Sequence, residues 1–496
     1  MVKDTTSIIH SLIRYPFLLF VGLILIIDLC IYFFVRMIVY FYEKSVVQGK
    51  LKHLLLLLAE ADSYDEYCKI ANLLDEYLQA NQWKLHEHTK LYDYQLIKEV
   101  TINLQMAMEI EDVVHCREMI TRSACKPNLA NIDNEELYSR SFIGTKTLIE
   151  EYHSTLLDAV KFVYFHIDDK MEFLSKIDDL YGRTALNLSG GAMMCLYHIG
   201  LIKTLHENKC LPRVLSGTSG GALFGSVLAT WKDEELHEFF EPSFHTRIQP
   251  CKESMWTKFM RLYKEGKLYS EVLWIQETRE VYGDLTFLEA FERTGRTWNI
   301  SVVSESGVNK LLNHLQAPDV LIWSAVLASS ALPGILNPFT LMMKSTRNAP
   351  NRYDINPIDI RPHPNDKREA PNGLYLVPFK GWGNSWRDGS LRMDIPREMN
   401  QQLNINFTVV SQVNPHVLPF FYNHKGMAGS PSIHRRGGGW RGGYLLSWWE
   451  HVIKLDLRKW LRVTMDLQML PPLLEVFEQI WLQKFHGNVT ITVFIN

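Results

Sequence analysis

The sequence predicts an α/β fold with a mostly parallel central sheet, and the evidence is concentrated between residues 184 and 228. Residues 184–188 form a short apolar run that is typical of a buried strand. Apolar residues recur at helical spacing from 193 to 206, and a second short apolar run covers 212–215. Two strands joined by a helix make a βαβ unit, which almost always crosses over with a right hand. The Gly-rich turns after the two strands then lie at the carboxyl edge of the sheet, where open α/β sheets place their chemistry.

The second turn, GTSGG at 217–221, matches the nucleophile elbow G-x-S-x-G. In such an elbow Ser219 would lie on a strained strand-to-helix turn with its hydroxyl exposed. A side chain at Gly217 or Gly221 would collide with the neighbouring strand or helix. A Gly-rich turn with a helix-capping serine is the plainer alternative. The strand before the turn, the helix expected from about residue 222 and the Gly-rich turn one crossover upstream favour the catalytic interpretation.

Length and composition narrow the class of protein. The 496 residues suffice for two or three domains, and 47% hydrophobic residues exclude a disordered chain. A net charge of −3 gives no reason to expect a nucleic acid as partner. The seven cysteines are scattered and lack C-x-x-C spacing, which indicates reduced thiols in a chain that faces the cytosol. No signal-peptide cleavage site follows the N-terminal apolar run, so we expect no secretory leader.

A polar tail is expected at 1–14, followed by a strongly apolar segment at 15–42. The segment is long enough to span a bilayer as a helix, since about 20 residues suffice. Asp28 lies in its middle, where a charge costs a few kcal/mol. A hairpin or shallow anchor in one leaflet, a true span and a buried core helix therefore all stay open. Lys44, Lys50 and Lys52 form a weak basic flank that suits a cytosolic side.

Residues 43–180 have the spacing of a helical domain, with apolar residues three and four apart and little Gly or Pro. His153 and Asp158 match the short acyltransferase pattern H-x-x-x-x-D. Their spacing places them on somewhat different faces of a predicted helix, and so short a pattern arises often by chance. We interpret this segment as a helical module that packs on the catalytic domain.

The catalytic domain is expected at 181–397. Its further elements are helices near 233–241, 269–282 and 319–330 and a strand at 298–304. A segment rich in Pro, Asn and Asp at 345–380 is interpreted as a surface insertion without regular structure. Asp388-Gly389 follows it, and places a carboxylate on a tight turn.

The C-terminal extension, 398–496, begins with a buried strand at 405–413 and ends in a strand-like run from residue 487. Between them lie a loop at 427–443 and a predicted helical region at 444–485. In that region Trp448, Trp449, Trp460 and Trp481 stand beside basic residues. This pattern suits either docking at a lipid headgroup layer or a buried helix pair.

A serine hydroxyl needs a neighbouring base to become a nucleophile. A Ser-acid-His triad would use Ser219, Asp388 and either His416 or His451, which have the order found in many hydrolases. A direct dyad of Ser219 and Asp388 is the alternative. Residue chemistry alone leaves both open.

Several motifs resemble the patatin-like phospholipase family: LSGG at 188–191, GTSGG at 217–221 and DGS at 388–390. The chain is most similar to the fungal and plant patatin-like triacylglycerol lipases. Further matching stretches are LYSRSFIGTKTLIEEY, YGRTAL, LASSALPGIL, SQVNPHVLPFF and the tryptophan-rich segment at 440–461. The helical segment resembles the domain that precedes the lipase domain in that family.

The resemblance implies a three-layer sandwich and an acyl-ester hydrolase without metal or other cofactor. It implies a dyad of Ser219 and Asp388 without a catalytic histidine, and an oxyanion hole made by the N–H groups of Gly190 and Gly191. It implies triacylglycerol as substrate, at a lipid droplet or the endoplasmic reticulum membrane, with the catalytic domain in the cytosol. Some members also transfer acyl groups to lysophospholipids, which keeps phospholipase or acyltransferase activity open; a silent lipid-droplet scaffold is a further alternative.

The loop departs from the family pattern G-G-G-x-R/K-G at two positions. Its third glycine is Ala192, and its basic residue is Met194. Ala192 is compatible with a backbone-built oxyanion hole if its φ is negative. Loss of the cation removes a contact for a charged headgroup, which favours neutral lipid over phospholipid.

Overall fold

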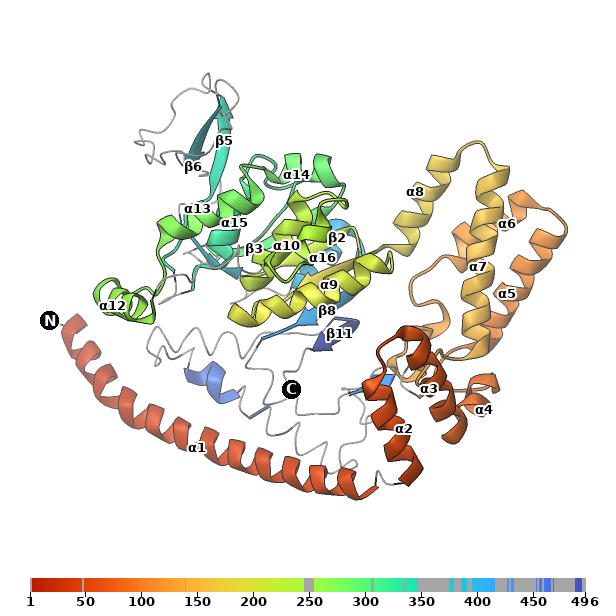
Figure 1. The fold of residues 1–496 in the computed structure, drawn as a ribbon, viewed down its shortest axis with the longest axis horizontal. Coiled ribbons are helices and arrows are strands. Elements are labelled where there is room, and N and C mark those ends of the chain that lie inside the picture. Colours follow the sequence, from red (N-terminus) through yellow and green to blue (C-terminus); the bar gives the residue numbers. More distant parts are fainter. Residues whose placement is uncertain are drawn as a thin grey trace. The chain divides into compact units, whose positions relative to one another are not determined.

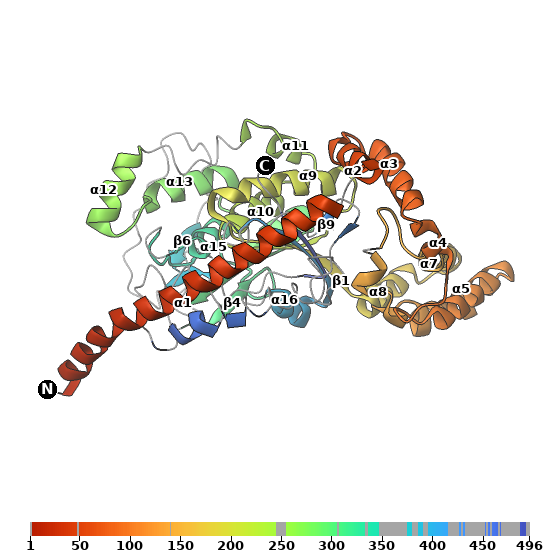
Figure 2. The same ribbon diagram turned by 90° about the horizontal axis from the view of Figure 1, so that it is seen from below.

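The structure is a computed structural model with two compact units, Met1–Gly182 with Pro419–Val463 and Arg183–Leu418 with Thr464–Asn496 (Figures 1 and 2). It describes residues 2–46, 49–138, 140–244, 254–304, 307–332, 336–346, 374–378, 385–389 and 395–414, and within the C-terminal part 426–427, 430–431, 452, 455–456, 459–464, 467 and 487–492.

The first unit begins with one long helix, α1 (Val2–Val46), which continues through Pro16. Residues 2–14, most of the predicted polar tail, belong to this helix. A proline removes a single hydrogen bond, which a helix of this length tolerates. By length and composition Ile13–Val35 is apolar enough to cross a membrane, and 17% of its apolar window is buried. One side of α1 contacts the C-terminal segment, where Phe20 and Trp460 form an edge-to-face pair with centroids 5.9 Å apart.

The remainder of this unit is helical, as the spacing predicts. Its elements are α2 (Gly49–Glu60), α3 (Tyr64–Tyr77), α4 (Ala80–Leu85), α5 (Tyr94–Glu109), α6 (Val113–Met119), η1 (Ile120–Ala124), η2 (Leu129–Asn131), η3 (Glu135–Tyr138), α7 (Thr147–His166) and α8 (Lys170–Tyr181). Helices α5 and α7 enclose one apolar core, and α2 and α3 a smaller one. Buried Asp75 joins distant parts of the chain, because it pairs with Lys84 at 2.8 Å and accepts the N–H of Phe142 at 2.7 Å.

The second unit contains a mostly parallel sheet in the order β11-β8-β1-β2-β3-β4, with β7 also paired to β3. The strands are β1 (Arg183–Leu188), β2 (Val214–Gly217), β3 (Thr297–Ser304), β4 (Asn309–Leu312), β7 (Trp386–Asp388), β8 (Ile405–Gln412) and β11 (Val489–Thr492). Neighbours from β11 to β3 are parallel, whereas β4 and β7 are antiparallel to β3. The predicted fold class is confirmed.

Both faces of the sheet are covered, because alternate residues of each strand point to opposite sides. Leu186 and Leu215 point into the main core, to which α10 and α15 contribute. Their neighbours Ala185 and Val214 belong to a second cluster with Met399 of α16. The sheet is therefore the middle layer of three.

The flanking elements are η4 (Ala192–Tyr197), α9 (His198–Glu207), α10 (Gly220–Thr230), α11 (Leu236–Phe239), α12 (Met255–Glu265), α13 (Glu271–Tyr282), α14 (Phe287–Thr294), α15 (Ile322–Ser329) and α16 (Ile395–Leu403). The helix predicted at 193–206 is divided: its first turn is 3₁₀, where Met194 N–H donates to the Gly191 carbonyl. Helices α12 and α14 were not predicted.

The segment 345–380 is not wholly irregular, which corrects the prediction. β5 (Met342–Thr346) and β6 (Leu374–Pro378) form an antiparallel pair, which joins the beginning of this segment to its end. Short β9 (Gly426–Met427) and β10 (Ser430–Pro431) form a further pair within the predicted loop.

Candidate active site

The turn after β2 has the geometry of a nucleophile elbow. Ser219 has φ 53° and ψ −122°, a strained conformation for a residue other than glycine, and α10 begins at the next residue. A Cβ on Gly221 would lie 2.2 Å from the Leu188 carbonyl oxygen, and one on Gly217 would lie 2.6 Å from the Gly221 oxygen. The collision predicted from the sequence is thus present at both glycines.

Gly221→Ala is expected to lower the free energy of unfolding by about 1–3 kcal/mol, because the added methyl group meets backbone atoms that cannot move aside. The displaced elbow should also lower esterase activity. Thermal unfolding and hydrolysis of a soluble ester measure the two effects. Gly200→Ala is the matched control, since nothing lies within 4 Å of a Cβ at this helical position. Equal stability of the two variants would contradict the tight approach.

The pairing of β3 brings Asp388 to the same place as Ser219. Ile300 of β3 pairs with Gly217 and with Leu312, so β2 and β4 lie on opposite edges. Val302 pairs with Lys310 of β4 on one edge and with Asp388 of β7 on the other. β7 therefore occupies the same edge of β3 as β2, just beyond the end of β2. Ser219 follows Gly217 by two residues, just as Val302 follows Ile300. The elbow that carries Ser219 and the strand that carries Asp388 therefore lie along one edge of β3.

Ser301 lies between these two pairing sites and fixes both. Its hydroxyl is hydrogen-bonded to that of Thr218, the residue before Ser219. A Cβ on Gly389 would lie 2.3 Å from the Ser301 carbonyl carbon. The backbone at Gly389 therefore packs directly against β3, and a side chain at this position would collide with it. This explains why glycine follows Asp388.

The end of α15 provides a second link between the two residues. The Ser219 N–H donates to Ser329 Oγ at 2.9 Å, and the Asp388 N–H donates to the Ala331 carbonyl at 3.3 Å. Ser329 and Asp388 are both fully buried. The stretch LASSALPGIL thus holds the backbone of both candidate catalytic residues.

Gly190 and Gly191 lie beside the elbow, where an oxyanion hole is expected. A Cβ on Gly190 would lie 3.3 Å from the Ser219 Cβ, and one on Gly191 would lie 2.7 Å from the Val413 oxygen. Among the residues that the structure describes, neither N–H donates a hydrogen bond. Both N–H groups are therefore candidates to receive the negative oxygen of an ester intermediate.

Two hydrogen bonds orient the peptide groups that carry these N–H donors. The Ser189 carbonyl accepts from His198 Nε2 at 2.9 Å, and the Gly190 carbonyl accepts from Ser189 Oγ at 3.1 Å. In a trans peptide the N–H points opposite to the carbonyl. Holding the two carbonyl oxygens therefore aims the N–H groups of Gly190 and Gly191 the other way.

His198 is buried and neutral. A carbonyl oxygen can only accept, so Nε2 bears the proton and Nδ1 accepts from Ser411 Oγ at 2.7 Å. Burial lowers the pKa of His198 to about 4, against a smaller opposing effect of its hydrogen bond to Ser189. No motif in the sequence singles out His198, Ser301 or Ser329. The pattern that could have indicated these three residues is a polar residue inside an otherwise apolar, buried run.

The remaining candidates do not join this site in the described residues. His416 and His451, the alternative triad bases, lie outside them. On α7, exposed Asp158 pairs with Lys161 at 3.3 Å, whereas half-buried His153 packs beside Tyr152. The two residues of the H-x-x-x-x-D pattern thus have separate surroundings. No group of three or more metal-ligating side chains occurs in the described part of the chain.

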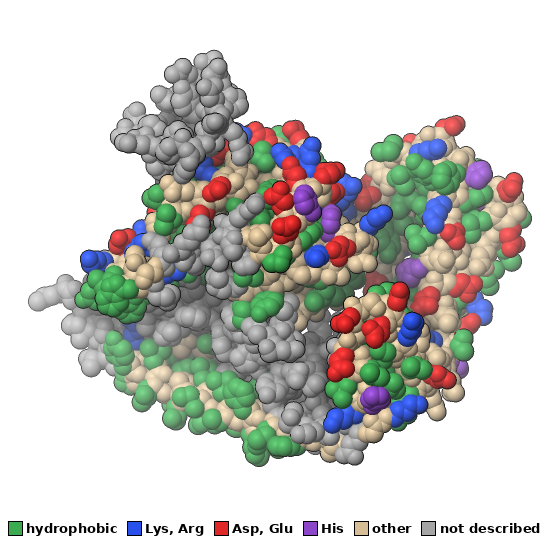
Figure 3. All heavy atoms as spheres, viewed as in Figure 1, with side chains coloured by type: hydrophobic (Ala, Val, Ile, Leu, Met, Phe, Trp, Pro, Cys, Tyr) green, Lys and Arg blue, Asp and Glu red, His purple; other side chains and the backbone are tan. Residues whose placement is uncertain are grey.

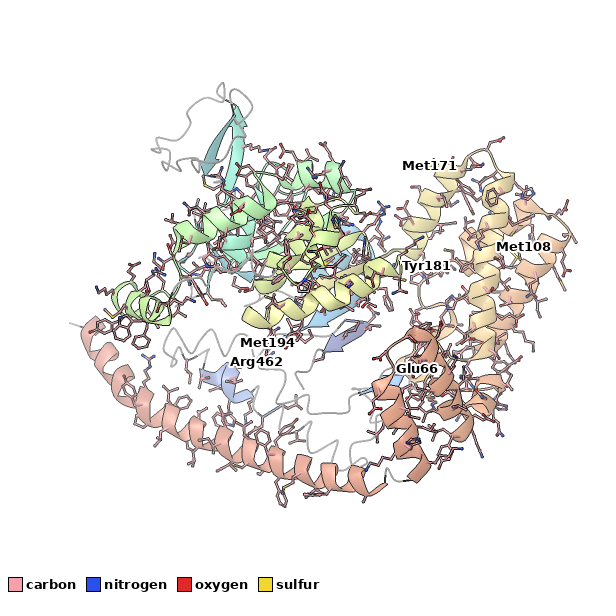
Figure 4. All side chains as sticks on the ribbon, viewed as in Figure 1. Glu66, Met108, Met171, Tyr181, Met194 and Arg462 are labelled. Carbon is pink, nitrogen blue, oxygen red and sulfur yellow. The ribbon has the colours of Figure 1, made fainter. Side chains whose placement is uncertain are left out.

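The two residues that differ from the family pattern, Ala192 and Met194, lie where the glycine loop leads into η4. Ala192 begins the 3₁₀ turn η4, a conformation in which φ is negative. Half-buried Met194 follows on the same turn, at the position labelled in Figure 4. An apolar thioether therefore stands where the family pattern has a cation.

The site thus combines a strained serine elbow, a buried aspartate and a glycine loop on a mostly parallel sheet. Residues 186–396 match the family model described as patatin-like phospholipase, and residues 44–179 match a domain of unknown function, DUF3336. A patatin-like phospholipase domain-containing protein of Aspergillus fumigatus is 38% identical over 99% of this chain and 68% of its own length. Relatives with the same description from Neosartorya fischeri and Emericella nidulans are each 37% identical, over 68% and 65% of their lengths.

The chain belongs to the patatin-like phospholipase domain family, as its motifs indicate. Membership of this family supports lipid acyl hydrolase activity for the chain.

Proposed function

We propose that this lipid acyl hydrolase acts on triacylglycerol through a dyad of Ser219 and Asp388. The observation that carries the proposal is the shared edge of β3, which pairs with β2 up to Gly217, two residues before Ser219, and with β7 at Asp388. The adjacent Gly190-Gly191 loop adds two N–H donors beside the elbow. A nucleophile, a base and oxyanion donors are the parts that acyl transfer needs.

In the proposed reaction Ser219 Oγ attacks the ester carbonyl carbon while Asp388 accepts the hydroxyl proton. The carbonyl oxygen becomes an oxyanion that accepts from the Gly190 and Gly191 N–H groups. Collapse breaks the ester bond, and the Asp388 proton passes to the departing alcohol oxygen, which leaves as diacylglycerol. Water then attacks the acyl-serine, gives its proton to Asp388 and releases the fatty acid as Ser219 recovers its hydrogen.

Neutral lipid is the proposed preference because Met194 replaces the cation of the family pattern. The site of action is proposed to be a lipid droplet or the endoplasmic reticulum membrane, to which α1 would attach. Phospholipid is the second candidate, since the relatives' descriptions include the word phospholipase.

A substrate panel tests this proposal. Wild-type protein is compared on triolein emulsion, phosphatidylcholine liposomes and lysophospholipid with an acyl donor, with Ser219→Ala as the blank. We expect fatty acid release to be fastest from triolein and absent from the blank. Faster cleavage of phosphatidylcholine would overturn the neutral-lipid preference. Failure of a fluorophosphonate to label Ser219 would instead support a silent scaffold.

A further inference from the structure

Helix α12 is amphipathic with its aromatic side outward. Trp256, Phe259 and Tyr263 lie three and four residues apart, on one face of the helix, and their exposed fractions are 70%, 63% and 82%. Figure 3 shows hydrophobic side chains gathered over this helix. A helix on a soluble domain ordinarily turns its apolar face to the core. Here that face points to solvent.

The inner side of α12 is held by basic residues instead. Lys258 is 6% exposed and lies over the Tyr269 ring, with Nζ 5.4 Å from the centroid. Arg261 Nη1 donates to the Leu268 carbonyl at 3.1 Å. Tyr269 in turn packs against Trp274 of α13 with centroids 6.0 Å apart. The helix is thus fixed to the catalytic unit through its polar side, and its exposed aromatics are not a consequence of fraying.

Basic residues outnumber acidic ones along this segment. Between Met255 and Glu271 the chain carries four basic residues, Lys258, Arg261, Lys264 and Lys267, and two acidic ones, Glu265 and Glu271. Lys264 is exposed beside Tyr263. Lys258 and Arg261 belong to the inner side of the helix, and Lys267 pairs with Glu265 and Glu271, so it is Lys264 that borders the aromatic face. Exposed aromatic rings with a lysine at their border are the pattern of a helix that lies in a lipid-water interface.

A small apolar depression lies at the start of α13, the helix that follows α12 in the chain. Glu271, the first residue of α13, helps to line this depression together with Leu327, Leu336 and Phe339. Leu327 lies on α15, two residues before Ser329, which binds the Ser219 N–H. This depression therefore lies between the start of α13 and the end of α15, on the side of the unit that also holds the elbow.

We infer that the aromatic face of α12 docks the catalytic unit on a lipid surface that contains anionic phospholipid. Trp256, Phe259 and Tyr263 enter the acyl-headgroup boundary, and Lys264 meets the anionic headgroups. This inference deepens the proposed function, because it assigns the surface through which the same site reaches its lipid. It is separate from the apolar helix α1, which would attach the chain to the membrane.

The test compares a bulk-lipid substrate with a dissolved one. The triple variant Trp256→Ser/Phe259→Ser/Tyr263→Ser in the full chain is expected to lower triolein hydrolysis about tenfold, because the interface contact is lost. Hydrolysis of soluble p-nitrophenyl butyrate should stay within about twofold, since no catalytic group changes. Val308→Ser/Leu315→Ser, at positions 49% and 63% exposed in the same unit, is the matched control. A triple variant with unchanged triolein hydrolysis, or with both activities lowered equally, would overturn the inference.

A second measurement does not depend on lipase activity. Amide hydrogen exchange of residues 255–265 is followed with vesicles of phosphatidylcholine alone and with about one part phosphatidylserine in five. We expect protection in the wild type that is greater with phosphatidylserine, is absent in the triple variant and is reduced in Lys264→Glu. Protection that rises with protein concentration in the absence of lipid would identify a second copy as the occupant and overturn a lipid surface. If the wild type binds this way but does not cleave triolein, the proposed substrate fails while the docking surface stands.

Discussion

Asp388→Asn is expected to lower kcat for a soluble ester by on the order of 10³-fold, because a positioned base contributes about 10²–10⁴. Asn has the size of Asp but cannot take the Ser219 proton. The Asp388 N–H would still donate to Ala331, since that contact uses the backbone. We therefore expect little change in thermal unfolding. Steady-state hydrolysis of p-nitrophenyl butyrate and a thermal melt check the two expectations together.

Ser219→Ala completes this prediction, since removal of the nucleophile should abolish hydrolysis and fluorophosphonate labelling. His416→Ala and His451→Ala test the triad in the same assay. A dyad predicts that each histidine variant keeps its activity within a fewfold, whereas a triad predicts a loss comparable to that of Asp388→Asn. If Asp388→Asn kept more than about a tenth of the activity, Asp388 would not be the general base.

The sequence predicted the elements that hydrophobic periodicity defines. Strand β1 was expected at 184–188 and runs from Arg183 to Leu188, and the expected strand at 405–413 is β8. Buried parallel strands are short apolar runs, so their ends are marked by the glycines that follow. The division of 193–206 into η4 and α9 was not predictable in this way, because apolar spacing over a single turn does not distinguish a 3₁₀ turn from an α-helical one.

The parts of the candidate site that lie in one short motif were predictable from the sequence. The parts that depend on how distant strands pair were not. The five residues GTSGG are enough to predict the elbow, and the positive φ of Ser219 agrees with that prediction. Asp388 required a resemblance, because the sequence does not show that β7 pairs with β3 on the edge of β2. Ser329 and His198 contribute through hydrogen bonds to backbone atoms, which leave no pattern in a single sequence. For α12 the spacing of its aromatic residues was visible, but only the structure shows that they face outward.

His198 offers the second large effect, because it would act on the oxyanion loop without touching the substrate. His198→Phe removes the Nε2–H that holds the Ser189 carbonyl, so the Ser189–Gly190 peptide is free to rotate. We expect kcat to fall by on the order of 10²-fold, near the lower end for the loss of an oxyanion donor. KM should change little, because ground-state binding does not use the oxyanion.

His198→Gln distinguishes positioning from packing, since its amide nitrogen can replace the Nε2–H donor. We expect it to recover most of the kcat that His198→Phe loses. Fluorophosphonate labelling of Ser219 also builds a negative oxygen in the loop, and its rate should fall in parallel with kcat in His198→Phe. If kcat and KM worsened together in both variants, His198 would have only a structural role.

The pH dependence of stability gives an independent check on the same residue. The folded-state pKa of His198 is lowered to about 4 from the ordinary value of 6.5. Above pH 6.5 the side chain is neutral in both states and contributes no pH dependence. Between pH 6.5 and about 4 the unfolded chain binds a proton that the folded chain does not, so the free energy of unfolding falls by roughly 3 kcal/mol as the pH falls. Denaturant unfolding across this range should show that loss in the wild type, and His198→Gln should lack this part of it; identical slopes would contradict a buried neutral His198.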